Sequence, residues 1–406
     1  MTINAQTHAI LLLTTHLGKQ TEVKPLTTSE WGRFAAWLRS QQFQPEQLLS
    51  HQLPQLLSEW SDPNISLERI QRLLDRAAAL GFALEKWQRA GIWVIIRSDP
   101  RYPQQLKQRL KQLAPPVLFG CGNSELLNTG GIAVVGSRHS TAAELEWTAQ
   151  LGTTLANHGA VVVSGGARGV DQAVMQAGLA ANGQVVGILA DSLLKTSLAA
   201  TYRQALQQHQ LVLVSPFNPE AGFDVGNAMG RNKYIYCLAD AAIVVNSTPN
   251  KGGTWHGALE NLKAQWVPLW VKPNAAASSG NAALLKQGAQ TLVEPIADLS
   301  QLINHPVMLE AAPLSLFDLL PVESNPAPIV AKPAITDLPV TINFYQLFLD
   351  YLEQTAKTPL TIEQIMQSLQ LTKPQVSEWL KRAIEAGYVV KINKPVRYHW
   401  CANTKI

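Results

Sequence analysis

The chain has 406 residues, more than the roughly 100–200 of a typical single domain, so we expect two or three domains. Its three cysteines lie far apart, which argues against a disulfide framework or a Cys-x-x-Cys metal site and favours the reducing cytoplasm. No apolar run reaches the ~18–20 residues that span a bilayer, and a net charge of +4 permits a polyanionic partner without requiring one. We therefore expect a cytoplasmic protein with no membrane partner.

Residues 1–90 contain short amphipathic patterns, which predict a small helical module similar to SAM or helix-hairpin-helix modules. One helix is predicted over 28–38, where Thr28 or Ser29 is available as the N-cap. The apolar face of this helix is expected to hold Trp31, Phe34, Ala35 and Leu38.

Residues 91–310 are predicted to form an extended Rossmann-like domain. A strand is expected at 92–96, followed by a turn at 99–103 that leads into a helix. Continuous apolar runs then alternate with helical stretches, which indicates an α/β doubly wound, mostly parallel sheet covered on both faces. The strands are expected at 132–135, 161–164, 185–190, 211–214, 242–246 and 266–271. In such sheets ligands bind at the carboxyl ends of the strands.

Residues 311–340 are rich in Pro and Ala without periodicity, and we interpret them as a linker. Residues 341–406 are predicted to form a winged helix, a helix-turn-helix variant. Its helices are expected at 344–354, 361–370 and 372–386, and its hairpin strands at 388–392 and 396–400. The stretch 375–382 is the candidate recognition helix, although Glu378 and Glu385 leave a protein contact open as the alternative to duplex DNA.

Two glycine-and-arginine loops follow neighbouring strands. Gly136-Ser137-Arg138 follows the strand at 132–135, and Ser164-Gly-Gly-Ala-Arg168 ends the next one. Glycine lets backbone amides approach a phosphate, the following helix N-terminus adds positive potential, and arginine offers a planar fork of donors. Each loop taken singly is also compatible with a plain turn and a surface arginine. Asp171 is expected to cap the helix that follows the second loop.

Two further loops have a similar character. Arg231, Asn232 and Lys233 are predicted at the start of an apolar helix over 234–239. Cations there oppose the helix dipole, so a bound anion would explain them, whereas solvated surface charges are the alternative. Lys251-Gly-Gly-Thr254 opens another helix, with the Thr254 hydroxyl as a potential phosphate donor.

Aromatic and catalytic candidates near these loops are few. Trp255 and His256 are placed to stack on a base, although a packed tryptophan is the commoner outcome. The chain lacks the G-x-G-x-x-G and G-x-x-x-x-G-K-[ST] fingerprints, so a standard NAD or ATP site is not expected. The Ser-x-x-Lys spacing at 192–195 has no partner motif. We therefore predict a binding protein rather than an enzyme, with no cofactor and no metal.

Taken together, these motifs resemble the DprA/Smf family of DNA-processing proteins. The resemblance rests on 99–103, 115–119, 134–138, 163–171 and Arg231-Asn-Lys233, in family order, with a terminal winged helix. It implies an extended Rossmann fold that binds single-stranded DNA, helps load the RecA recombinase during natural transformation, and forms a dimer.

The loops and the resemblance together give the candidate DNA and phosphate contacts. They are Gly136, Ser137, Arg138, Ser164, Gly165, Gly166, Arg168, Arg231, Asn232, Lys233, Lys251, Gly252, Gly253 and Thr254. The second loop has Gly166 where the family usually has Leu, and Lys251-Gly-Gly-Thr254 replaces a Ser-Gly-Ser loop, which indicates a divergent branch. The alternative is a nucleotide-binding enzyme or sensor similar to LOG-type proteins, in which a carboxylate such as Glu260 positions a water.

Overall fold

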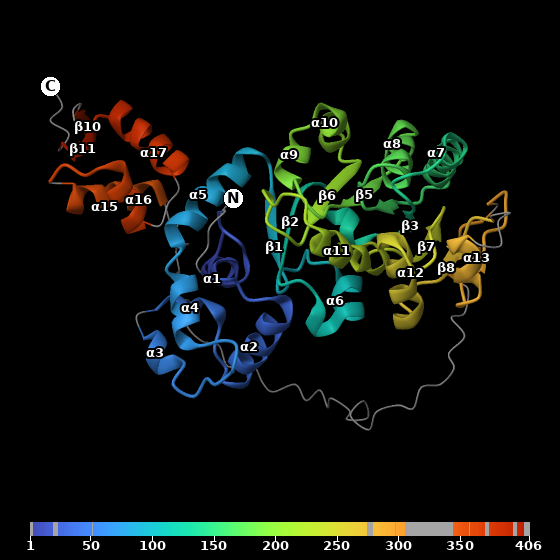
Figure 1. Ribbon diagram of the computed structural model, residues 1–406, viewed down its shortest axis with the longest axis horizontal. Helices are drawn as coiled ribbons and strands as arrows, with labels where there is room; N and C mark the ends of the chain where they lie inside the picture. The colour runs from blue at the N-terminus through green and yellow to red at the C-terminus, as the bar shows by residue number, and fades with distance from the viewer. Residues whose placement is uncertain are drawn as a thin grey trace, which may run out of the picture.

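The computed structural model describes residues 3–18, 23–50, 52–273, 279–296, 298–304, 344–356, 358–369, 373–392 and 396–401. The predicted linker at 311–340 lies outside these ranges. Figure 1 shows the N-terminal helices and the C-terminal elements on the left, and the α/β part on the right. Within the described ranges, no helix combines the length and the hydropathy needed to cross a membrane.

The N-terminal helices pack around α1 (Ala5–Thr14), which is buried along most of its length. Around it lie α2 (Thr28–Ser40), η1 (Pro45–Leu49), α4 (Leu67–Leu74) and α5 (Ala77–Arg89).

The helix predicted over 28–38 is confirmed, with Trp31, Phe34 and Leu38 buried. Its N-cap is Thr27, however, and neither Thr28 nor Ser29. The reason is a capping box, in which Thr27 and Glu30 each accept a hydrogen bond from the other's backbone N–H.

One sheet organises the α/β part, and its order among the described strands is β1-β2-β6-β5-β4-β3-β7-β8-β9. The strands β3 to β9 are mutually parallel, whereas β1 and β2 form an antiparallel edge against β6. The bounds are β1 (Trp93–Ile96), β2 (Val117–Gly122), β3 (Ile132–Val135), β4 (Val162–Ser164), β5 (Val185–Ile188), β6 (Leu211–Ser215), β7 (Ala241–Val244), β8 (Leu269–Val271) and β9 (Gln290–Thr291). The predicted doubly wound, mostly parallel sheet is confirmed.

Alternate residues of each strand enter two separate apolar cores. Ile132 and Val134 pack with Leu151 on one face, while Ala133 and Val135 pack with Ile235 on the other. The first face is covered by α7 (Ala142–Asn157), α8 (Val170–Ala180) and α10 (Ala200–Gln207), and the second by α6 (Gln104–Leu110), α11 (Val225–Cys237) and α12 (Gly252–Ala264). Burial on both faces explains why the strands are continuous apolar runs in the sequence.

The sheet reverses its order at β3. From β3 the chain continues through β4, β5 and β6 in one direction, and then returns to β7, β8 and β9 on the other side. Such a reversal opens a crevice at the carboxyl ends of the two central strands, where ligands bind in doubly wound folds. The loops after β3 and β7 therefore share one crevice.

The C-terminal unit, residues 344–401, has its own apolar core. Its described elements are α15 (Phe344–Thr355), α16 (Ile362–Leu369), α17 (Lys373–Glu385) and the hairpin of β10 (Val389–Ile392) with β11 (Arg397–Trp400). These elements match the predicted order of helices and strands, while their function as a winged helix stays a prediction.

Candidate nucleic-acid interface

Two adjoining cavities lie at the carboxyl edge of the sheet. The first, of about 520 Å³, lies between the loops that follow β3 and β7, and the second, of about 1060 Å³, lies beside the ends of β4 and β5. Both are lined by Arg138, His139, Ala167, Phe223 and Arg231. The two cavities therefore form a continuous groove across the end of the sheet.

The first loop is held in place by Asn246, which follows β7. The backbone N–H of Ser137 donates to Asn246 Oδ1 at 2.7 Å, and Asn246 Nδ2 donates to Ser140 Oγ at 3.0 Å. This loop thus uses the Ser137 amide internally, while the Arg138 side chain is exposed over the groove. No local pattern predicts this role of Asn246, because its partner lies 109 positions away.

The second loop is tightly packed at its first glycine, Gly165. A Cβ on Gly165 would lie 1.8 Å from Arg231 Nη1 and 2.6 Å from Asp171 Oδ2, so only glycine fits there. Arg168 is exposed and lines the second cavity. Ser164, by contrast, is buried, and its hydroxyl donates to the Val134 carbonyl at 2.7 Å. Ser164 therefore ties β4 to β3 and lines neither cavity.

Asp171 was predicted to cap α8, but this prediction is wrong, because Gly169, at φ 87°, occupies the N-cap position. The side chain instead turns inward and is buried, and its carboxylate accepts the Ala167 N–H at 3.4 Å. Asp171 therefore ties the second loop to the start of α8. Burial raises the pKa of this carboxyl group, and the charge of Arg231 works in the opposite direction.

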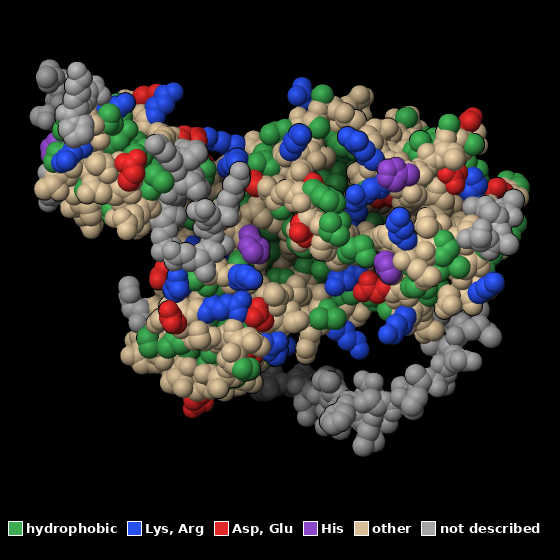
Figure 2. Space-filling view, in the orientation of Figure 1, with side chains coloured by type: hydrophobic (Ala, Val, Ile, Leu, Met, Phe, Trp, Pro, Cys, Tyr) green, Lys and Arg blue, Asp and Glu red, His purple; other side chains and the backbone are tan. Residues whose placement is uncertain are grey.

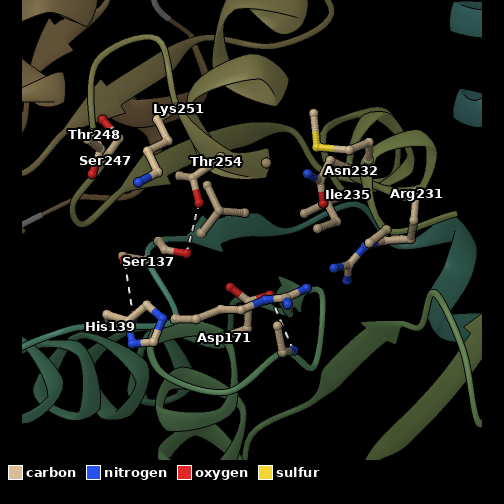
Figure 3. A pocket seen from close by; sticks show the side chains of 18 of the residues that line it. Ser137, His139, Asp171, Arg231, Asn232, Ile235, Ser247, Thr248, Lys251 and Thr254 are labelled. Atoms are coloured by element: carbon tan, nitrogen blue, oxygen red, sulfur yellow. Dashed lines mark hydrogen bonds between the residues drawn. The ribbon is translucent and has the colours of Figure 1, made fainter. Parts of the chain in front are cut away.

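Arg231 is not at a helix start, which corrects the prediction for the third loop. Helix α11 already begins at Val225, where Asp224 accepts the Asn227 N–H at 2.8 Å as its N-cap. The Arg231 side chain points into the crevice opposite Asp171 (Figure 3) and is only 4% exposed.

The Arg231 guanidinium is only partly satisfied. Its Nη1 donates to the Ile188 carbonyl at 2.5 Å, and its Nε has no hydrogen-bond partner among the described residues. Burial lowers the pKa of Arg231, an effect that the charge of Asp171 opposes.

The two residues that follow Arg231 on α11 differ in whether they line the groove. Asn232 lines the first cavity and lies close to Gly253, where a Cβ would be 2.6 Å from its Nδ2. Lys233 lines neither cavity, and its ammonium lies 5.4 Å from the ring centroid of Tyr234. The structure therefore brings Arg231 and Asn232, but not Lys233, to the groove.

The fourth loop opens α12 as predicted, and Lys251 is exposed at its N-cap beside the first cavity, together with Gly252 and Gly253. The Thr254 hydroxyl donates to the Gly136 carbonyl at 2.8 Å, so it holds the first loop and is not free to donate to a phosphate. Trp255 is buried in the core, which contradicts its use as a stacking platform. Glu260 is exposed on α12 and lines neither cavity.

Phe223 and Lys195 line the groove but had no role in the predicted site. Phe223 is 60% exposed, and its ring centroid lies 5.2 Å from the Arg138 guanidinium carbon. Lys195, on α9 (Leu193–Ser197), lines the second cavity. Phe223 could have been considered as a candidate, because it is an aromatic residue between Gly222 and Asp224 in a loop. Lys195 is part of the Ser-x-x-Lys match at 192–195, which we did not count as a site.

Positive charge is gathered locally along this groove. Figure 2 shows Lys and Arg side chains between α9 and α10 above and α12 below. The cations that line the two cavities are Arg138, Arg168, Lys195, Arg231 and Lys251. Among the described residues that line them, Asp171 and Asp191 are the carboxylates. Cations spread along a groove beside an exposed aromatic ring suit an extended polyanion with flat bases.

Relatives of the chain are DNA-processing proteins. The DNA processing protein DprA of Bacillus subtilis is 29% identical over 272 residues, covering 61% of this chain and 88% of that protein. Protein Smf of Escherichia coli is 31% identical over 202 residues, covering 48% of this chain and 52% of that protein.

One solved structure shows a similar fold. The structure of DNA processing protein A from Streptococcus pneumoniae superimposes with a TM-score of 0.55 at 19% identity, covering 72% of this chain and 95% of that one. A Helicobacter pylori DNA processing protein A, solved for its single-stranded DNA binding mode, is 27% identical and covers 52% of this chain and 94% of that one. Its TM-score is 0.43.

The family model for DNA recombination-mediator protein A matches residues 93–304, just over half of the chain. The matched segment runs from β1 through α14 (Ser300–Ile303) and includes every loop of the groove. The chain therefore belongs to the DNA recombination-mediator protein A family, the DprA/Smf family of DNA-processing proteins.

Proposed function

We propose that this protein binds single-stranded DNA along the groove at the carboxyl edge of its sheet. Arg138 and Phe223 carry this proposal, because a cation and an exposed ring in contact lie between the two cavities. The phosphates lie against Arg138, Arg168, Lys195 and Lys251, and a base stacks on Phe223. Glycines of the first two loops let the backbone approach the strand.

A single strand fits this groove better than a duplex. Stacking on a protein ring requires an unpaired base, since the bases of a duplex already stack on each other. The cations are distributed along two adjoining cavities rather than around one point, as a chain of phosphates requires. Binding is therefore expected to be tolerant of sequence and to weaken as salt rises.

The recombination-mediator family supports a further step. We infer that the bound strand is handed to a RecA-type recombinase, so that the protein acts in transformation or recombination as a non-enzymatic mediator, as a homodimer. The division into a helical module (1–90), a DNA-binding domain (91–310) and a winged-helix domain (341–406) belongs to the same proposal.

A single nucleotide in the first cavity is the second candidate. Arg231 Nε and the Tyr236 hydroxyl are buried at this cavity without hydrogen-bond partners among the described residues, which favours a polar ligand there. The exposed position of Glu260 outside the cavity removes the carboxylate that the alternative needed to position a water.

Fluorescence anisotropy of a labelled poly-dT oligonucleotide tests the proposal. Wild type is compared with Arg138→Ala/Arg168→Ala at two salt concentrations, with labelled duplex titrated separately as a control and an unlabelled nucleoside monophosphate as competitor. We expect salt-sensitive binding that prefers single strands and is lost in the double variant. Absence of binding by folded wild type contradicts the proposal, and competition by the monophosphate at low concentration favours the second candidate.

The inferred recombinase step has a separate test. A RecA-type recombinase is slow to form filaments on DNA that is covered by a single-strand-binding protein, and ATP hydrolysis reports its loading. We expect wild type to shorten the lag, and Arg138→Ala/Arg168→Ala to leave it unchanged. A variant that still shortens the lag would show that loading does not pass through the groove.

A further inference from the structure

Helix α5 packs against the C-terminal unit, far from the DNA groove (Figure 1). The rings of Phe82 and Trp379 meet edge to face, with centroids 5.5 Å apart at 62°. Ala78 and Ala79 pack against the same apolar core, which contains Trp379 and Phe348. Trp379 is only 2% exposed, so α17 is in close apolar contact with the rest of the protein.

Helix α5 makes contacts through two of its faces. Leu80, Ala83 and Trp87 are buried in the core beneath the N-terminal helices. Ala78, Phe82, Glu85 and Arg89 are three or four residues apart, a spacing that places them on one face of a helix. That second face is the one that contacts the C-terminal unit.

The charges on α5 and α17 form opposite-charge pairs only when the two helices run antiparallel. Arg382 Nη1 lies 3.3 Å from Glu85 Oε1, and Arg89 Nη1 lies 3.3 Å from Glu378 Oε1. Each helix thus has a glutamate followed by an arginine four positions later. In the antiparallel contact opposite charges meet, whereas a parallel contact would place glutamate on glutamate and arginine on arginine. The charge pattern therefore selects the observed orientation.

Glu85 also fixes the aromatic contact, because its Oε2 accepts the Trp379 Nε1–H at 3.3 Å. The four charged side chains are between 31% and 62% exposed, so each ion pair alone changes the docking equilibrium by no more than about fivefold. The buried Phe82–Trp379 contact supplies most of the affinity, and the charges supply direction.

The outer face of α17, defined here as the face that carries Glu378 and Arg382, is poorly suited to binding DNA phosphates. Glu378 and Arg382 face α5, and Lys381 lies 3.9 Å from Glu385 on the same helix. We propose that α17 is a protein-docking helix whose partner is α5 of the same chain, and that its outer face binds α5 in place of duplex DNA. The C-terminal unit is thereby held against the N-terminal helices.

Charge exchange between the two helices tests this proposal in the full-length protein. Glu85→Arg/Arg89→Glu and Glu378→Arg/Arg382→Glu each keep the net charge but place like charges together. We expect each variant to raise hydrogen exchange in α17 about fivefold or more, and the combined four-residue variant to recover most of the protection. Recovery stays incomplete because the Trp379 bond to Glu85 is lost.

Matched controls and a second variant make the outcomes decisive. Exchanging Arg33 and Asp62, which pair at 2.9 Å within the N-terminal helices, should leave α17 unchanged. Phe82→Ala should release α17 more than either charge exchange, with Phe43→Ala, also among the N-terminal helices, as its control.

Unchanged exchange in both single-helix variants and in Phe82→Ala would overturn the proposal. A released variant that binds duplex about tenfold more tightly than wild type would also overturn it, since α17 would then be a masked DNA reader. Release without a gain in duplex affinity supports it.

Discussion

Arg138 and Arg231 face the same crevice but differ in their surroundings. Arg138 is exposed beside the ring of Phe223, and Arg231 is buried, bonded to a strand carbonyl and close to Asp171. An arginine can bind a ligand only with the groups that the fold leaves available. We therefore assign DNA contact mainly to Arg138 and construction of the groove floor mainly to Arg231.

The largest effect that separates the two arginines is expected in stability. Arg231→Ala removes the donor to the Ile188 carbonyl and the cation nearest the buried Asp171 carboxylate, which we expect to lower the free energy of unfolding by about 3 kcal/mol. Urea denaturation followed by circular dichroism measures this. Arg231→Met combined with Asp171→Asn should recover part of the loss, because no buried charge remains. Wild-type stability in Arg231→Ala would remove the distinction between the two arginines.

Arg138→Ala is expected to do the opposite and leave the free energy of unfolding unchanged. Loss of one charge-assisted phosphate contact should weaken single-strand binding by about 2 kcal/mol and make its salt dependence shallower by ~0.7 per contact. Lys233→Ala, which removes a cation outside both cavities, is the matched control in anisotropy titrations. Equal losses in the two variants would show that bulk charge, not the groove, governs binding.

Phe223→Ala should weaken binding by about 1–2 kcal/mol, because one base loses its stacking surface. Phe223→Leu keeps an apolar side chain and separates stacking from simple burial. An oligonucleotide with abasic sites measures the same contact from the DNA side. The loss in Phe223→Ala should disappear with that oligonucleotide, and a loss that persists would assign Phe223 a structural role.

The smallest effect is expected from removing the residues after Val340. Since no described residue of the C-terminal unit lines the two cavities, single-strand binding should stay largely intact. The truncated protein is first checked by circular dichroism and then titrated with poly-dT. Complete loss of binding by a folded truncation would place part of the DNA site in the C-terminal unit.

Seven of the nine described strands of the sheet and three of the four loops were predictable, because buried parallel strands are continuous apolar runs and glycines mark their ends. The strands β2 and β9 were not predicted. Arg231 was misplaced because Gly226 and Gly230 resemble a loop, whereas the Asp224 cap starts the helix before them. Thr254 and Asn246 depend on partners more than a hundred positions away. The exposure of Phe223 likewise follows from packing that no local pattern contains.

The antiparallel pairing of β2 with β6 bears on how the chain folds during synthesis. Gly122 at the end of β2 leaves the ribosome well before Leu211 opens β6, and at ~5–20 residues per second the wait is several seconds. During that time β2 has β1 as its strand partner and the N-terminal helices on one face, but its other edge awaits β6. The nascent chain therefore exposes an apolar strand edge that chaperones are expected to bind until β6 arrives.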